Sequence, residues 1–356
     1  MNESMSRLLQ GAMWVGVLGF SCAAVRAQAA PIRVDGSSTV FPVAEAVAEE
    51  FQKAKKGAIK VTVGIAGTGG GFKKFARGET DISNASRPIL KEEMKACKEG
   101  GVEYIELPIC FDALTVAVNP KNDWVTSITV EELKKIWEPA PKDQPHPVTH
   151  WNQVRKEWPA EKIVLFGAGS DSGTFDYFTE AICGKAKASR GDFTASEDDN
   201  VLVQGIEGNK YALGYIPFAY YEPHKDRMKA LAIEWSKNSV KTPVLPSTEN
   251  VLKSVYNPLS RPLFIYVNRK SADKPEVKEF VEFFLKEAEK LTKEVKYLPL
   301  PAWAYQTGLN RFQQRQVGTG FGGVPEVGLT IDALLLRTPV TDARDATPGA
   351  PPAEKK

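Results

Sequence analysis

The clearest signal in this 356-residue sequence is the segment Ile32-Arg33-Val34-Asp35-Gly36-Ser37-Ser38-Thr39-Val40-Phe41-Pro42. Residues 32–34 predict a short β-strand. Helical spacing of apolar residues begins at Phe41, with Pro42 in the first helical turn, where proline is favoured. Glycine and hydroxyl residues join the strand to the helix. A strand, a tight turn and a helix in this order are typical of α/β folds.

The same alternation continues along the chain, as apolar runs alternate with segments of helical spacing. We expect strands at 59–65, 102–109, 114–118, 162–166, 211–216 and 262–267, and helices at 41–56, 72–77, 91–99, 130–137, 174–183 and 276–291. The pattern therefore predicts an α/β protein with helices on both faces of its sheets.

Two further turns resemble the first in composition. They are Gly67-Thr68-Gly69-Gly70-Gly71-Phe72-Lys73 and Gly167-Ala168-Gly169-Ser170-Asp171-Ser172-Gly173-Thr174-Phe175. Each lies between a predicted strand and a predicted helix. Hydroxyls and free backbone N–H groups therefore gather at a helix N-terminus, which attracts anions. One such turn alone would indicate only an ordinary cap. Three together predict an anion-binding site.

Composition limits the class of protein. The chain has 42% hydrophobic and 25% charged residues and a net charge of +2, so it can form two folded lobes but has no large basic field for nucleic acid. A multi-span membrane protein is excluded as well. The four cysteines, at 22, 97, 110 and 183, are too few for a disulfide scaffold. Cys97 and Cys110 lie at opposite ends of the predicted strand 102–109, so we predict no disulfide between them.

The first 29 residues have the features of a secretory signal peptide. Arg7 precedes an apolar run, and Ala27-Gln28-Ala29 is a small-residue cleavage site. We expect the mature protein to be exported and soluble, or tethered by a lipid on Cys22. Residues 316–323 are expected to be a glycine-rich linker, and residues 341–356 a disordered tail.

The turns do not match common enzyme motifs. Phe72 stands where a P-loop and a dinucleotide fingerprint each need a glycine, and Ser172 lacks the flanking glycines of a hydrolase elbow. His146 and His150 are four residues apart, but the surrounding prolines favour a solvated loop over a helical metal pair. We therefore predict no catalytic residue, metal or cofactor. An exported phosphatase and a structural or adhesive secreted protein are the alternatives from other classes.

Six motifs resemble those of the exported phosphate-binding proteins of bacterial ABC phosphate importers, most closely the subgroup found in cyanobacteria. They are Asp-Gly-Ser-Ser-Thr-Val-Phe-Pro (35–42), Gly-Thr-Gly-Gly-Gly-Phe-Lys-Lys-Phe (67–75), Asp-Ile-Ser-Asn-Ala-Ser-Arg-Pro-Ile (81–89), Asp-Ser-Gly-Thr-Phe-Asp-Tyr-Phe (171–178), Asp-Asp-Asn-Val-Leu-Val-Gln-Gly (198–205) and Ser-Arg-Pro-Leu-Phe-Ile-Tyr-Val-Asn (260–268). The likeness extends over residues 31–315.

This resemblance implies a two-lobed periplasmic binding protein of type II. Each lobe would be a mixed sheet flanked by helices, with the ligand in the cleft between the lobes. Lobe one would hold residues 31–115 and 258–315, lobe two residues 116–257, and the hinge would lie at 114–118 and 264–268. Residues 316–356 would form a C-terminal extension. The implied function is to bind inorganic phosphate in the periplasm and to deliver it, as a monomer, to the membrane permease of an ABC importer.

The resemblance also implies which residues bind phosphate. They are Ser38, Thr39, Thr68, Gly69, Gly70, Ser86, Arg87, Asp171, Ser172, Gly173 and Thr174. Two positions depart from the family pattern. Arg87 stands where many members have an aspartate that accepts a hydrogen bond from protonated phosphate, and Ala168 stands where many have an arginine. The cation has thus moved to the other lobe. The alternative for Arg87 is a surface salt bridge.

The missing aspartate bears on the choice of anion. A carboxylate accepts hydrogen bonds only, so it repels fully ionised sulfate, and its loss leaves sulfate, arsenate and phosphonate as alternative ligands. Asp171, Asp35 and Asp176 are candidates to replace it, and the position of Asp171 at the turn favours that residue.

Overall fold

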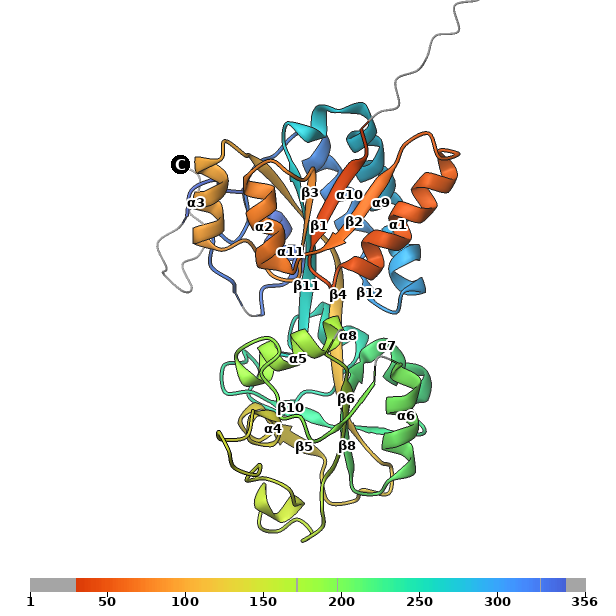
Figure 1. The fold of residues 1–356 in the computed structure, drawn as a ribbon, viewed down its shortest axis with the longest axis vertical. Coiled ribbons are helices and arrows are strands. Elements are labelled where there is room, and N and C mark those ends of the chain that lie inside the picture. Colours follow the sequence, from red (N-terminus) through yellow and green to blue (C-terminus); the bar gives the residue numbers. More distant parts are fainter. Residues whose placement is uncertain (1–29, 171, 197, 327, 344–356) are drawn as a thin grey trace, which may run out of the picture.

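The computed structural model describes residues 30–343 except 171, 197 and 327. The chain forms two lobes that meet at a narrow junction (Figure 1). One sheet runs through both, with its strands in the order β2-β1-β3-β11-β4-β8-β6-β7. The predicted signal peptide, with Cys22, lies outside the described residues.

Lobe one is built on three parallel strands and two antiparallel neighbours. β1 pairs in parallel with β2 and β3, and β11 pairs antiparallel with both β3 and β4. The strands are β1 (Ile32–Gly36), β2 (Val61–Ile65), β3 (Ile82–Ala85), β11 (Ser260–Asn268), β12 (Leu298–Pro299) and the first part of β4 (Tyr104–Val118). The helices are α1 (Phe41–Ala54), α2 (Thr68–Ala76), α3 (Lys91–Glu99), η3 (Ser271–Asp273), α9 (Pro275–Glu294), α10 (Ala302–Gln313) and α11 (Ile331–Leu336).

Lobe two continues the sheet from the end of β4. β8 pairs antiparallel with β4 and parallel with β6, which pairs in parallel with β7. The strands are β5 (Ser127–Thr129), β6 (Val164–Ala168), β7 (Thr194–Ser196), β8 (Ala212–Pro217), β9 (Lys229–Ala230) and β10 (Ala232–Glu234). The helices are α4 (Val130–Trp137), η1 (Trp151–Gln153), α5 (Gly173–Cys183), α6 (Asp199–Gly208), α7 (Phe218–Tyr221), η2 (Glu222–His224) and α8 (Thr248–Leu252).

These elements confirm the predicted α/β class, and the bounds of α3 and α4 are as predicted. β3 was not predicted. Its sequence, Ile-Ser-Asn-Ala, carries no strand pattern, yet all four residues are buried because β1 and β11 pair with it on its two sides. Tertiary pairing therefore overrides the local sequence signal here.

β4 enters the junction as one continuous strand where we predicted two separate strands. β4 has 15 residues, all buried, and joins the predicted strands 102–109 and 114–118. Residues 110–113 stay extended because they pair with residues 260–263 of β11, and pairing with β8 begins at Leu114. The predicted position of the second crossing, 264–268, is wrong, because residues 264–267 pair with β3 inside lobe one. The chain returns earlier, where residues 260–263 pair with residues 110–113 of β4.

The predicted linker at 316–323 is also wrong, because this segment packs onto lobe one. The Gly318 amide donates to the Tyr104 carbonyl over 2.7 Å, and Thr319 pairs with Val340. The buried carboxylate of Glu106 accepts from the Thr319 hydroxyl and, over 2.9 Å, from the Gly320 amide. Of the predicted tail, residues 341–343 are described and exposed. Residues 344–356 lie outside the described part.

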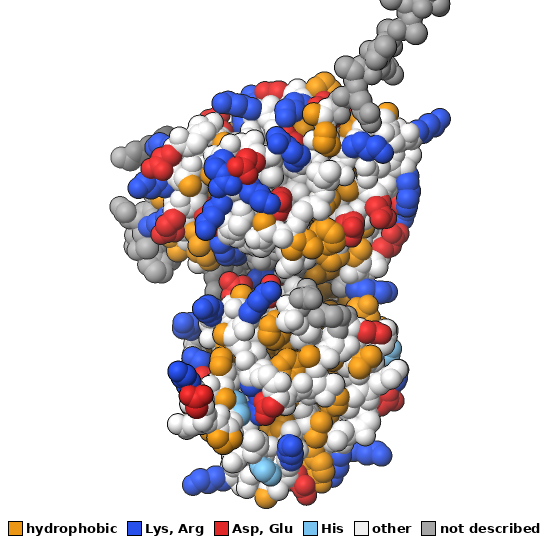
Figure 2. Space-filling model, viewed as in Figure 1, with side chains coloured by type: hydrophobic (Ala, Val, Ile, Leu, Met, Phe, Trp, Pro, Cys, Tyr) orange, Lys and Arg blue, Asp and Glu red, His pale blue; other side chains and the backbone are white. Residues whose placement is uncertain are grey.

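The described cysteines, Cys97, Cys110 and Cys183, are free thiols. None of the described helices is long and apolar enough to cross a membrane. Basic and acidic side chains lie interspersed over both lobes on the face drawn in Figure 2, in keeping with the small net charge.

Candidate anion site at the lobe junction

The turn after β1 brings Ser38 and Thr39 to the junction. The Ser37 amide donates to the Asn84 carbonyl over 3.0 Å, and the Ser37 carbonyl accepts from the amide of Phe41, the first residue of α1. The Tyr297 hydroxyl donates to the Thr39 carbonyl over 2.9 Å. The turn is thus held by backbone bonds to β3 and by a tyrosine that follows α9.

The glycine-rich turn after β2 forms the start of a helix. α2 begins at Thr68, four residues before the predicted start, because Gly67 adopts a φ of +73° and turns the chain directly into the helix. Gly71 then packs against β1, where a Cβ on Gly71 would lie 2.6 Å from the Cα of Gly36. This close contact places the N-terminus of α2, with Gly69 and Gly70, beside the end of β1.

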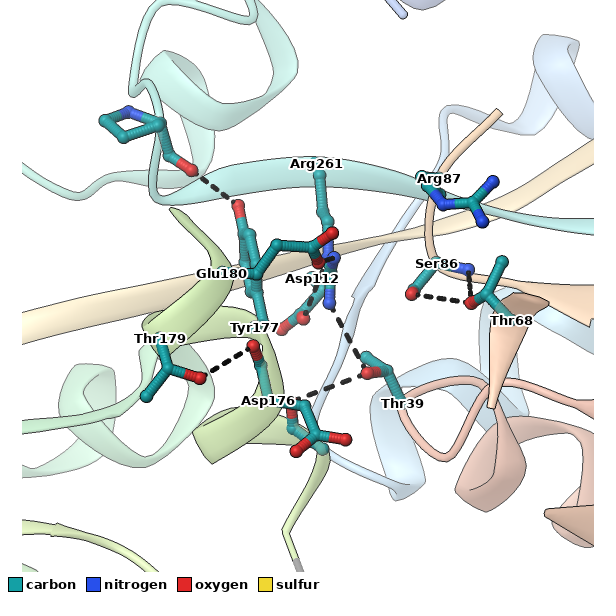
Figure 3. Close-up of polar contacts among 12 residues, drawn as sticks. Thr39, Thr68, Ser86, Arg87, Asp112, Asp176, Tyr177, Thr179, Glu180 and Arg261 are labelled. Carbon is teal, nitrogen blue, oxygen red and sulfur yellow. Dashed lines mark hydrogen bonds and ion pairs between the residues drawn. The ribbon is translucent and has the colours of Figure 1, made fainter. Parts of the chain in front are cut away.

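Thr68 and Ser86 share one hydrogen-bonded cluster in lobe one. Their hydroxyl oxygens lie 3.0 Å apart, and the Ser86 amide donates to the Thr68 hydroxyl over 3.2 Å. Ser86 directly follows β3, and β2 and β3 are both parallel to β1. The carboxyl ends of these strands therefore bring the two predicted ligands together (Figure 3).

The third turn comes from lobe two and contacts the first. Ser172 caps α5 by accepting from the Thr174 amide over 3.1 Å. The Thr39 hydroxyl donates to the Gly173 carbonyl over 3.5 Å, and a Cβ on Gly173 would lie 2.8 Å from the Cα of Thr39. The junction thus brings the helix ends of the two lobes into contact. Asp171 lies outside the described residues.

Arg87 reaches the N-terminus of α2 but already has an anionic partner. Its two terminal nitrogens donate to the two carboxylate oxygens of Glu93, each over 2.8 Å. A Cβ on Gly69 would lie 3.8 Å from the Arg87 guanidinium. The salt bridge that we considered as the alternative for Arg87 is therefore present, with the guanidinium beside the predicted site.

Arg261 is the residue that sequence reasoning missed. It lies on β11 within the quoted Ser-Arg-Pro motif, and its guanidinium stacks 3.6 Å from the ring centroid of Tyr177 on α5. One terminal nitrogen lies 3.4 Å from the Thr39 hydroxyl and the other 3.2 Å from Glu180 on α5. The motif was the available signal, but position 261 is far along the chain from all three turns.

The carboxylates near the junction differ in their surroundings. Asp112, on β4, lies 3.7 Å from the Nε of Arg261, and burial raises its pKa to about 6 although Arg261 acts in the opposite direction. Burial also raises the pKa of Asp176, in the first turn of α5, although Lys187, 3.9 Å from its Oδ1, acts in the opposite direction. Asp35 is paired with Lys74 over 2.6 Å.

A cavity of about 270 Å³ adjoins these groups. Ser86 and Arg87 line it from lobe one, Tyr177 and Glu180 line it from lobe two, and Arg261 lines it between them. Most of the remaining walls are apolar, with Phe111, Pro258 and Phe321 among them. The cavity is therefore an interlobe space that polar groups enter from both sides.

No group of three His, Cys, Asp or Glu side chains is placed to hold a metal ion within the part of the chain that the structure describes. His146 is buried rather than solvated. Its ring nitrogens contact the carbonyls of Val148 and Glu138, each over 3.0 Å, so its surroundings are those of a structural residue.

The fold and the junction define a class of protein, the two-lobed substrate-binding proteins. A sequence model described as a PBP superfamily domain matches residues 22–288, and the chain belongs to that superfamily. Within it, the chain belongs to the family of SphX and PstS phosphate-binding proteins. It is 51% identical to Protein SphX of Synechocystis over 94% of this chain and 98% of the relative. It is 36% identical to the phosphate-binding protein PstS of Staphylococcus saprophyticus over 77% of this chain and 82% of that protein.

Solved structures agree with this assignment. A possible phosphate binding protein from Planctomyces limnophilus is 46% identical and superposes with a TM-score of 0.75, covering 80% of this chain and 98% of that one. A putative phosphate ABC transporter substrate-binding protein from Clostridium perfringens, solved with bound phosphate, is 25% identical with a TM-score of 0.52 and covers 76% of this chain and all of that one.

Proposed function

We propose that this protein binds inorganic phosphate between its lobes and delivers it to an ABC-type importer. The contact between Thr39 and Gly173 carries the proposal, because it joins the turn before α1 to the N-terminus of α5 in the other lobe. The N-terminus of α2, at Thr68 to Gly70, lies beside the end of β1, which this turn follows. Each helix end contributes about half a positive charge and free N–H donors, which suit a dianion without a metal.

The proposed ligands are the hydroxyls of Ser38, Thr39, Thr68, Ser86 and Ser172 and the backbone around Gly69, Gly70, Gly173 and Thr174. Hydrogen bonds to a charged group contribute roughly 1.5–3 kcal/mol each. A micromolar site needs about 8 kcal/mol in total, so this set is sufficient even after the lobes and the ligand lose solvent.

Calorimetric titration of purified, phosphate-stripped protein tests this proposal. We expect one phosphate per chain with micromolar or tighter affinity. If the protein is folded, as judged by circular dichroism, and does not bind phosphate, the proposed function is wrong. Incubation with a chromogenic phosphate ester tests the phosphatase alternative. A phosphatase would hydrolyse the ester, whereas a binding protein would not. We assign binding because the chain belongs to a family of substrate-binding proteins.

Asp176 is the described carboxylate that we propose for selectivity against sulfate. It lies in the first turn of α5, close behind the proposed ligands Ser172 to Thr174, and its buried Oδ1 has no hydrogen bond but lies 3.9 Å from the Nζ of Lys187. A carboxylate oxygen without a hydrogen bond can accept the proton of hydrogen phosphate, which sulfate lacks at neutral pH. We expect Asp176→Asn to narrow the phosphate-to-sulfate affinity ratio at least tenfold. An unchanged ratio would leave that role to Asp171.

Release of phosphate to the permease requires the lobes to separate. We propose that lobe one, residues 31–115 and 258–315, moves against lobe two, residues 116–257. β4 would bend near Leu114, where its pairing changes from β11 to β8. We propose further that the protein acts in the periplasm as a monomer after removal of residues 1–29. Size-exclusion chromatography with light scattering tests the monomer. Mass spectrometry of the exported protein tests the cleavage, because a chain that begins at residue 30 has lost Cys22, whereas a lipid-anchored chain would retain it.

A further inference from the structure

A positively charged side chain would add to the partial charges of the helix ends at the site. Two candidates near it, Arg87 and Lys74, are each paired with a carboxylate in lobe one. Arg87 forms two hydrogen bonds to Glu93, which is only 15% exposed, so this ion pair is well shielded. Lys74 is paired with Asp35 over 2.6 Å. Position 168, where we expected an arginine in related proteins, is an alanine. A side chain that adds such charge would therefore have to come from elsewhere.

Arg261 has the location that such a charge requires. Its side chain is 14% exposed and lines the interlobe cavity together with Ser86. Its guanidinium contacts the turn before α1 through Thr39 and contacts α5 through Tyr177 and Glu180. It is thus in contact with proposed phosphate-binding elements of both lobes, and Figure 3 shows it between them.

The partners of Arg261 differ in how easily an anion can replace them. Asp112 is buried on β4 and lies 3.7 Å from Nε, so it stays beside the guanidinium and orients it. Glu180 is 47% exposed on α5, and its 3.2 Å contact with Nη1 is open to solvent. A phosphate oxygen can take the place of the Glu180 carboxylate, because the glutamate can swing into water at little cost.

We propose that Arg261 is the cationic side chain that contacts the bound anion and that Asp112 positions its guanidinium. In the absence of the anion, the Glu180 carboxylate pairs with Arg261, and the bound anion displaces it. The inference rests on the proposed phosphate binding and adds the residue that supplies its charge. A planar guanidinium can donate two parallel hydrogen bonds to one anion, which a lysine cannot. Because Arg261 contacts both lobes, its bond to the anion also links ligand binding to their approach.

Titration calorimetry with inorganic phosphate on the wild-type protein and four variants tests this. In Arg261→Gln we expect phosphate affinity to fall at least a hundredfold. In Arg261→Lys we expect it to fall at least tenfold, because lysine cannot donate two parallel hydrogen bonds to one anion. In Arg87→Gln, whose charge Glu93 already neutralises, we expect a fall of less than tenfold. In Glu180→Gln we expect phosphate affinity to rise two- to tenfold, because the competing carboxylate is gone.

The outcomes separate this inference from the proposed function. If the wild-type protein does not bind phosphate, the proposed function fails. If it does and Arg261→Gln binds within threefold of it, or Arg87→Gln loses more than Arg261→Gln, the assignment to Arg261 is wrong. Glu180→Gln guards against misfolding of the arginine variants, because its side chain is half exposed. If Glu180→Gln binds phosphate no more tightly than the wild type, the claim that the anion displaces the Glu180 carboxylate from Arg261 is wrong.

Discussion

Gly173 and Thr39 belong to different lobes and approach so closely that only a glycine fits at position 173. A Cβ there would lie 2.8 Å from the Cα and 3.0 Å from the backbone nitrogen of Thr39. Both atoms are backbone, so a rotamer change cannot relieve the contact. The smallest possible substitution therefore tests whether the closed junction is needed for binding.

We predict that Gly173→Ala lowers phosphate affinity at least tenfold while changing the free energy of unfolding by less than about 1 kcal/mol, because the extra methyl holds the lobes apart and leaves each core intact. Calorimetry and urea unfolding measure the two quantities. Gly191→Ala is the matched control in lobe two, since a Cβ at Gly191 meets nothing within 4 Å. Wild-type affinity in Gly173→Ala would show that binding does not need this contact.

Gly71 makes the equivalent close approach within lobe one. A Cβ there would lie 2.6 Å from the Cα of Gly36 and 3.0 Å from the Ser83 hydroxyl, so Gly71→Ala must push α2 away from β1. We predict a loss of about 1–3 kcal/mol in the free energy of unfolding, together with weaker phosphate binding, because Thr68 moves with the helix.

The stability control for this variant lies on the same helix. A Cβ on Gly69 would meet its nearest neighbour at 3.8 Å, an ordinary contact, and alanine favours a helix over glycine. Gly69→Ala should therefore be as stable as wild type or more so in urea unfolding. Equal stability of Gly71→Ala and Gly69→Ala would mean that the β1–α2 contact relaxes without cost.

Asp112 makes stability depend on pH. Burial raises its pKa from the ordinary value of 3.8 to about 6, so the folded state holds the proton that the unfolded chain releases between these values. The contribution of Asp112 to stability is therefore most favourable below pH 4, becomes less favourable as the pH rises toward 6, and is lower by about 3 kcal/mol above that. Asp112→Asn removes this penalty, so its stability relative to wild type should rise across the same window.

Urea unfolding of the wild type and of Asp112→Asn between pH 4 and pH 7.5 measures the difference between their free energies of unfolding. The titration of all other groups is common to both proteins and cancels in this difference. At pH 7.5 we expect Asp112→Asn to be the more stable protein. Parallel pH profiles would show that Asp112 keeps an ordinary pKa beside Arg261.

Thr319 attaches the C-terminal segment to the core of lobe one. Its hydroxyl donates to the buried Glu106 carboxylate and accepts from the Phe321 amide over 3.1 Å. Thr319→Val removes both bonds and leaves the buried Phe321 amide without this acceptor, although Glu106 keeps the Tyr266 hydroxyl and the Gly320 amide as donors. We predict a loss of about 1–3 kcal/mol in the free energy of unfolding.

Thr62→Val is the control, because Thr62 is exposed on β2 and its hydroxyl donates only to the Ile32 carbonyl over 3.3 Å, where water can replace it. It should change stability by less than about 0.5 kcal/mol. A similar loss in both variants would argue against a special role for Thr319.

The alternation of apolar runs and helical spacing was readable from the sequence, because periodicity and capping are local properties. The three turns after β1, β2 and β6 were recognisable for the same reason, since hydroxyls and glycines before a helix serve backbone N–H groups that belong to that helix. The family resemblance, carried by motifs such as residues 35–42 and 171–178, implied that the turns meet.

The partners of individual charges and the continuity of β4 were decided only by the tertiary structure. Arg87 was predicted to face the ligand, but Glu93, six residues away, takes both of its terminal nitrogens. Arg261, more than 220 residues after the first turn, reaches Thr39 because β11 returns the chain to the junction. The spacing of apolar residues predicts where helices and strands form, because it is a local property. Charge pairing depends instead on which distant segments the sheet brings within a few ångströms of one another.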